Sequence, residues 1–96
     1  MPYDPLTSTL PDGVRLIQGR QFNDARGWFM ELHRRDSGHE LPDFVQDNVS
    51  LTSQPAVVRG LHFQRPPHAQ AKLVTVLAGA ILDVVVDLRR DSPHFG

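Results

Sequence analysis

One short segment of the chain holds the residue types that proton-transfer chemistry requires. His62 lies in the mostly apolar run 58–64, and imidazole is the side chain best suited to proton transfer near neutral pH. Lys72 follows in the next apolar run and is the one lysine of a chain that otherwise uses arginine. A histidine base beside a lysine cation could form and stabilise an enolate. The alternative is that His62 is a hydrogen-bonded structural residue and Lys72 a chance cation on a strand edge.

Polar side chains near this segment could hold a phosphorylated or sugar-like ligand. Arg59 precedes His62 by three positions, so strict alternation puts the two on opposite faces of a strand. They can meet at one ligand only if the backbone is distorted, and Gly60 is where distortion is cheapest. Without it, Arg59 is a solvated cation. Gln46 and Asn48 share one face of the preceding segment, where amides either line a pocket or face water.

The histidine spacing argues against a metal site. Two histidines at i and i+2 can share a metal from one face of a strand, but the sequence reads His62-Phe63-Gln64. The other four histidines are scattered, and no cysteine is present to supply a disulfide or a thiolate ligand. A Gly-rich phosphate loop and a nucleophile elbow are also missing. We therefore expect no metal and no cofactor.

The elements that would position these residues are short strands separated by turns. Alternation with a period of two predicts strands over 13–18, 27–33, 44–52, 57–64, 72–77 and 81–88. Proline, glycine and polar residues predict turns at 11–13, 34–40, 65–67, 78–80 and 91–93, the second with room for one short helix and the fourth as a hairpin. In the last strand the core face would consist of Leu82, Val84, Val86 and Leu88. Asp83 and Asp87 would lie opposite, where Asp83 either orients a basic group or is solvated. This pattern is typical of an all-β sandwich or barrel.

Length and composition bound the class of protein. The chain has 96 residues, 40% apolar and 22% charged, which fits one small globular domain over 1–96. A net charge of -1 means that the chain has no excess of basic residues with which to bind nucleic acid. The N-terminus lacks the pattern of a secretory signal, and no apolar run is long enough to span a membrane. We expect a cytoplasmic protein with neither nucleic acid nor membrane as a partner.

Several blocks of this sequence resemble the dTDP-4-dehydrorhamnose 3,5-epimerase family. The matching blocks, in the family's order from about residue 10 to the end, are 24–31, 44–50, 58–64, 72–76, 83–89 and 92–96. Trp28, Val58 and Phe63 are conservative variations where the family often has Phe, Leu and Tyr.

The resemblance implies a dimeric, metal-free, cupin-type antiparallel jelly roll. It implies epimerisation of dTDP-4-keto-6-deoxyglucose at C3 and C5 in dTDP-L-rhamnose biosynthesis. His62 matches the family's general base, and Lys72 matches the basic residue beside it. The positions that match substrate-binding residues are Arg26, Glu31, Gln46, Asn48 and Arg59.

Family members are longer, and their tyrosine general acid lies in the half that has no counterpart here. The chain also ends directly after a turn, without closing strands, so we expect an incomplete jelly roll that is inactive alone. Three alternatives stay open: a related sugar-nucleotide ketoisomerase, a one-position epimerase on the same scaffold, and a non-catalytic nucleotide-sugar-binding module.

Overall fold

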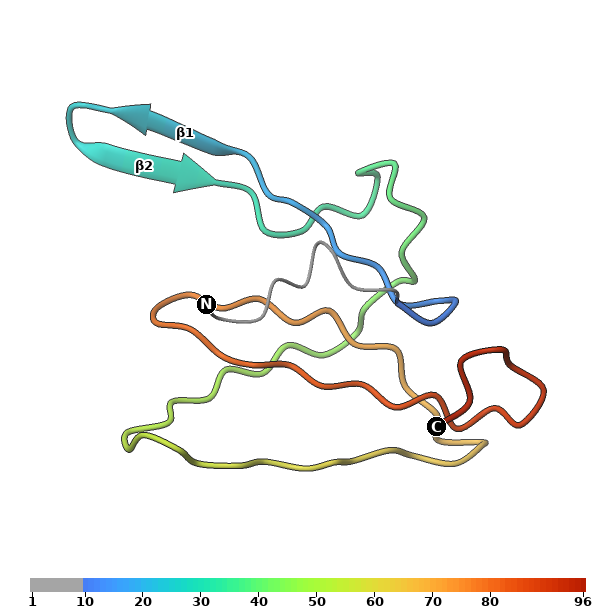
Figure 1. Cartoon of the computed structure of the whole chain (residues 1–96). Helices are drawn as coiled ribbons and strands as arrows, with labels where there is room; N and C mark the ends of the chain where they lie inside the picture. Colours follow the sequence, from blue (N-terminus) through green and yellow to red (C-terminus); the bar gives the residue numbers. More distant parts are fainter. Residues whose placement is uncertain (1–9) are drawn as a thin grey trace. The chain divides into compact units, whose positions relative to one another are not determined.

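The computed structural model describes residues 10–96 (Figure 1). These residues fall into two units. One unit comprises the described residues up to Leu32 together with Leu82–Gly96, and the other is His33–Ile81. The first unit contains strands β1 (Gln21–Asp24) and β2 (Gly27–Met30), which form an antiparallel pair. No helix occurs in the described residues, so none there is long and apolar enough to cross a membrane. The regular structure is therefore all β, as the sequence predicts.

Strands β1 and β2 form a hairpin whose turn is organised by Asp24. The pairing places Phe22 opposite Phe29. The Asp24 carboxylate accepts a hydrogen bond from the Arg26 backbone N–H at 2.8 Å, the local bond that makes aspartate a turn-forming residue. Its other oxygen lies 2.6 Å from Arg26 Nη2, and these contacts with Arg26 lower the pKa of Asp24. Gly27 closes the turn with a φ of +143°, which side-chain-bearing residues rarely adopt.

This hairpin confirms one strand prediction in part and adds a strand that was not predicted. The strand expected over 27–33 is present as far as Met30. Strand β1 was missed because Gln21, Asn23 and Asp24 are polar and Phe22 alone gives no alternating pattern.

The other five predicted strands are not formed, and those expectations are wrong for this structure. Outside the β1–β2 ladder, backbone hydrogen bonds among the described residues close turns, and one isolated bridge joins Asp87 to Phe95. The segments 13–18, 44–52, 57–64, 72–77 and 81–88 therefore have no ladder. A strand exists only where a second strand accepts and donates its backbone hydrogen bonds. Local alternation cannot supply that partner.

The turn predictions fare better, because a turn is a local structure. Backbone N–H groups donate to the carbonyl three residues earlier at four of the predicted places. These bonds are Val14 to Pro11 at 3.1 Å, Ser37 to Arg34 at 3.2 Å, His68 to Arg65 at 2.8 Å and Ser92 to Arg89 at 3.1 Å. The chain also bends around Gly79, where φ is +83°. The expected hairpin at 78–80 is wrong, however, because its two flanking segments do not pair.

Most large apolar side chains are exposed in the part of the chain that the structure describes. None of them is buried there. The predicted core face of the last segment is 70%, 55%, 45% and 56% exposed at Leu82, Val84, Val86 and Leu88. That expectation is wrong because no second layer of the described residues covers this face. The buried side chain of the segment is the polar one, Asp87.

The hairpin gives a direct test of the role of Gly27. Forcing a residue with a side chain into a conformation that favours glycine costs about 1–3 kcal/mol. An isolated two-stranded hairpin is only marginally stable. Gly27→Ala should therefore abolish the β1–β2 pairing, seen as loss of cross-strand NMR contacts between Phe22 and Phe29. Ala25→Ser in the same turn should preserve them, and retention of the contacts in Gly27→Ala would contradict this account of the turn.

Candidate functional site

The two proposed catalytic residues lie in the unit His33–Ile81. His62 and Lys72 are both exposed, and within residues 10–96 neither makes a hydrogen bond or an ion pair. Because the segments that carry them are not paired into a sheet, they have no sheet face in common. The expectation that they face one cavity stays a prediction. Both side chains are accessible to a ligand.

The backbone departs from strand geometry at the position where the sequence suggested it. Gly60 has a φ of +105°, whereas strand residues have a strongly negative φ. A Cβ at this position would lie 3.4 Å from the backbone N and from Nδ1 of His62, which is an ordinary contact, so the φ is what favours glycine here. Gly60 therefore permits the local bend.

Arg59 is engaged by the loop that precedes it. Its Nε donates to Thr52 Oγ1 at 3.2 Å, and its Nη2 lies 3.5 Å from the Leu51 carbonyl oxygen, at the limit of a hydrogen bond. These contacts close the loop around the turn at 54–56. Arg59 is thus exposed to solvent but held by two contacts to the preceding loop. A ligand phosphate would have to replace these two exposed contacts.

Gln46 and Asn48 are brought together, as their spacing predicts. Gln46 Nε2 donates to Asn48 Oδ1 at 3.3 Å, so the two amides lie on the same side of an extended segment. The pair is exposed, and each amide keeps further donors and acceptors for a ligand.

The other two predicted binding residues belong to the unit that contains the hairpin. Arg26 lies in the turn after β1, with its side chain 91% exposed and paired with Asp24. Glu31 follows β2 directly. An ion pair this exposed contributes little to stability, so Arg26 can exchange Asp24 for another anion at small cost.

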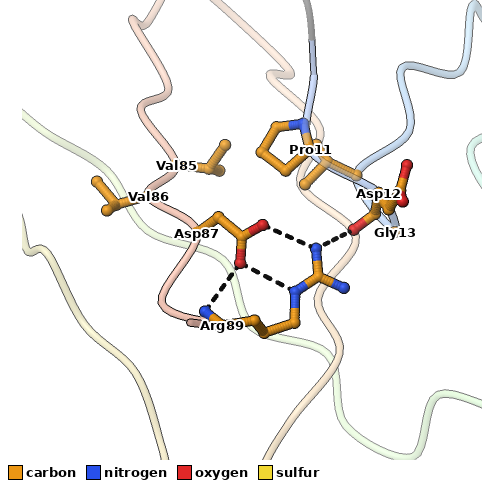
Figure 2. A pocket seen from close by; sticks show the side chains of 8 residues that line it. Pro11, Asp12, Gly13, Val85, Val86, Asp87 and Arg89 are labelled. Atoms are coloured by element: carbon orange, nitrogen blue, oxygen red, sulfur yellow. Dashed lines mark hydrogen bonds and ion pairs between the residues drawn. The ribbon is translucent and has the colours of Figure 1, made fainter. Parts of the chain in front are cut away.

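A densely hydrogen-bonded polar cluster lies at a place that the sequence did not single out. Asp87 is 7% exposed, and its carboxylate accepts four hydrogen bonds, of which Figure 2 shows those from Arg89. Three come from Arg89: its backbone N–H at 3.0 Å, Nε at 2.9 Å and Nη2 at 3.0 Å. The fourth comes from the Ser92 hydroxyl. Arg89 Nη2 also donates to the Asp12 carbonyl oxygen at 2.8 Å.

These bonds fix the charge state of the cluster. The hydrogen bonds from Arg89, followed by that from Ser92, lower the pKa of Asp87 far below its ordinary value, and Asp87 in turn raises the pKa of Arg89. The cluster borders a hollow of about 260 Å³. That hollow is lined by Pro11, Asp12, Gly13, Val14, Val85, Val86, Asp87 and Arg89, so it contains none of the residues predicted to carry the chemistry. The available signal in the sequence was an aspartate followed by arginine two positions later and by serine in a turn five positions later.

Comparison with known proteins decides the family. Residues 8–96 match the family model described as dTDP-4-dehydrorhamnose 3,5-epimerase. The chain belongs to this family. Curated relatives of that name include one from Sinorhizobium fredii, 49% identical over 86% of this chain and 44% of the relative. A second, from Salmonella typhimurium, is 43% identical over 95% of this chain and 51% of the relative. A third, from Methanothermobacter thermautotrophicus, is 45% identical over 88% of this chain and 46% of the relative.

The dTDP-4-dehydrorhamnose 3,5-epimerase family match covers most of this chain but only part of each relative. The chain spans about half the length of the curated relatives it matches. No solved structure matches it.

Within residues 10–96, no three histidine, aspartate or glutamate side chains gather in a group that could hold a metal ion.

The lowered pKa of Asp87 predicts how the cluster responds to acid. The ionised form accepts the four hydrogen bonds, so its stabilisation is complete above the ordinary value of 3.8 and declines as the pH falls toward the lower folded-state pKa. NMR signals of residues 92–96 should therefore keep their folded positions until the pH falls below 3.8. Asp87→Asn should already lack these positions near neutral pH, whereas Asp83→Asn should behave like the unaltered chain. Loss of the folded signals well above pH 3.8 would contradict the assignment.

Proposed function

We propose that the protein to which these residues belong epimerises a dTDP-linked 4-keto-6-deoxy sugar at C3 and C5. The observation that carries this proposal is the family match over 8–96, which includes both His62 and Lys72. The matched relatives carry the name dTDP-4-dehydrorhamnose 3,5-epimerase. The proposed substrate is dTDP-4-keto-6-deoxyglucose, and the proposed product leads to dTDP-L-rhamnose.

The reaction suits a base and a cation placed beside a ketone. The protons at C3 and C5 both flank the C4 carbonyl, so removal of either gives an enolate. In the proposed mechanism His62 removes the proton, because imidazole exchanges protons near neutral pH. Lys72 then stabilises the negative charge that develops on the C4 oxygen. Inversion further requires an acid that returns a proton to the opposite face of the sugar, a role for which residues 10–96 offer no tyrosine.

The proposed binding residues divide by the chemistry of the ligand. Arg26 and Arg59 are suited to the diphosphate, because guanidinium presents a fork of donors that matches phosphate oxygens. Both are held only by exposed contacts, so phosphate can displace those contacts at little cost. Gln46 and Asn48 are suited to sugar hydroxyls, since each amide both donates and accepts. Glu31 completes the proposed set as an acceptor.

The same resemblance supports the wider setting that we propose. The complete fold is a cupin-type jelly roll, in which further strands would pair with the segments that lack a ladder here. The active protein is a homodimer in the cytoplasm. The hydrophobic side chains exposed along 45–64 and 73–88 favour such completion, because burying one valine or leucine contributes about 1.5–3 kcal/mol.

A chimera tests this function. Residues 1–96 would be fused in register to the C-terminal half of the Salmonella typhimurium relative, and substrate would be incubated with it in deuterium oxide. The chimera should incorporate deuterium at C3 and C5 and form the epimer. The 96-residue chain alone should give at most slow exchange and no epimer. Efficient inversion by the chain alone would contradict the need for a further acid.

Two histidine variants separate the proposed base from a general effect of substitution. His62→Ala should lower the rate of exchange in the chimera by about a hundred- to ten-thousand-fold, the usual contribution of a positioned base. His68→Ala, in the turn after the same segment, should retain the rate. Equal activity of the two variants would refute His62 as the base. Substrate binding without exchange would favour a non-catalytic module, and inversion at one carbon would favour a one-position epimerase.

A further inference from the structure

The cluster around Asp87 differs in kind from the rest of the described structure. Three other ion pairs of the described residues have both side chains at least half exposed: Arg26 with Asp24, Arg34 with Asp36 and Arg35 with Asp43. The Asp87 side chain is 3% exposed, and its carboxylate is saturated by donors. A buried carboxylate persists only where it is paired and hydrogen-bonded, so the ion pair with Arg89 is what keeps it inside.

Arg89 connects this carboxylate to the other end of the described chain. One guanidinium binds both Asp87 oxygens, and its Nη2 also reaches the backbone carbonyl of Asp12, 77 positions away (Figure 2). The acceptor belongs to the turn that Val14 closes onto Pro11. Lysine could not replace this arrangement, because a single ammonium lacks the planar fork.

The turn that follows Arg89 is also held by hydrogen bonds to Asp87. The Ser92 hydroxyl donates to the carboxylate and accepts a bond from the His94 backbone N–H at 3.1 Å. The Gly96 N–H donates to the Asp87 carbonyl oxygen at 2.9 Å, which forms the bridge between Asp87 and Phe95. Side chain and backbone of Asp87 therefore both hold the turn.

We propose that Asp87, Arg89 and Ser92 form a polar latch that fastens the turn at 11–14 to the turn at 89–95. Arg89 is the central residue of this latch, because its guanidinium binds both the Asp87 carboxylate and the Asp12 carbonyl oxygen. The cluster is not an anion site, since the guanidinium is already neutralised by a buried carboxylate. Removing Arg89 leaves Asp87 buried without its ion partner, so the carboxylate moves into water and both turns are released. The latch thus holds these two turns together by polar contacts, in a described structure that has no buried apolar side chain.

The chain contains no cysteine, so one introduced thiol can report whether the latch is closed. Asp12→Cys leaves the backbone carbonyl that Arg89 uses and allows attachment of a nitroxide spin label. In the otherwise unaltered 96-residue chain, this label should broaden the amide NMR signals of residues 85–95. Arg89→Gln should abolish the broadening. Arg90→Gln is the matched control, because it removes an adjacent arginine outside the cluster, and it should retain the broadening.

Two further variants keep the test decisive. Arg89→Lys keeps the positive charge but loses the planar fork of N–H donors, so it should also reduce the broadening. This variant tests the latch even if Arg89→Gln unfolds the whole unit. Ser92→Ala should keep the broadening but speed amide hydrogen exchange at His94, whose acceptor it removes. Cross-strand contacts between Phe22 and Phe29 would show that the hairpin survives in each variant. Broadening that is absent from the unaltered chain, or undiminished in both Arg89 variants, would overturn the latch.

Discussion

The structure depends on one constraint: the backbone groups of a β-strand must be paired by another strand. Among residues 10–96 this condition is met along β1 and β2 and at the Asp87–Phe95 bridge. The remaining strand-like segments therefore lack a ladder, and without a sheet there is no second layer to cover their apolar side chains. The exposure of valines and leucines and the reliance on polar contacts both follow from this one condition.

The turns could be predicted from the sequence, because they are determined by interactions between residues that are close in sequence. Proline, glycine and aspartate placed the turns at 11–13, 65–67 and 91–93 correctly, because the bonds that close a turn lie within a few residues. The strands required a partner distant in sequence, which alternation does not identify. Even β1, adjacent to its partner, was missed because its polar residues face water on both sides of an isolated hairpin.

The site follows the same division. The spacing of Gln46 and Asn48 correctly placed two amides together, and the bend expected at Gly60 is present. Whether His62 and Lys72 share a cavity depends on strand pairing, so alternation alone could not determine it. The cluster at Asp87 was missed for a different reason. Period-two reasoning assigned alternate residues to a core face and put Asp87 on the opposite side, whereas four hydrogen bonds make the aspartate the better buried residue.

Residue-resolved amide hydrogen exchange tests this constraint most directly, measured on the 96-residue chain and on its chimera with the C-terminal half of the Salmonella typhimurium relative. In the chain alone, protection should be confined to β1, β2 and the turn fastened by Asp87. In the chimera it should extend through 44–52, 57–64, 72–77 and 81–88, because the added strands supply the missing ladders. Strong protection of these four segments in the chain alone would contradict the claim that they need partners beyond the described residues.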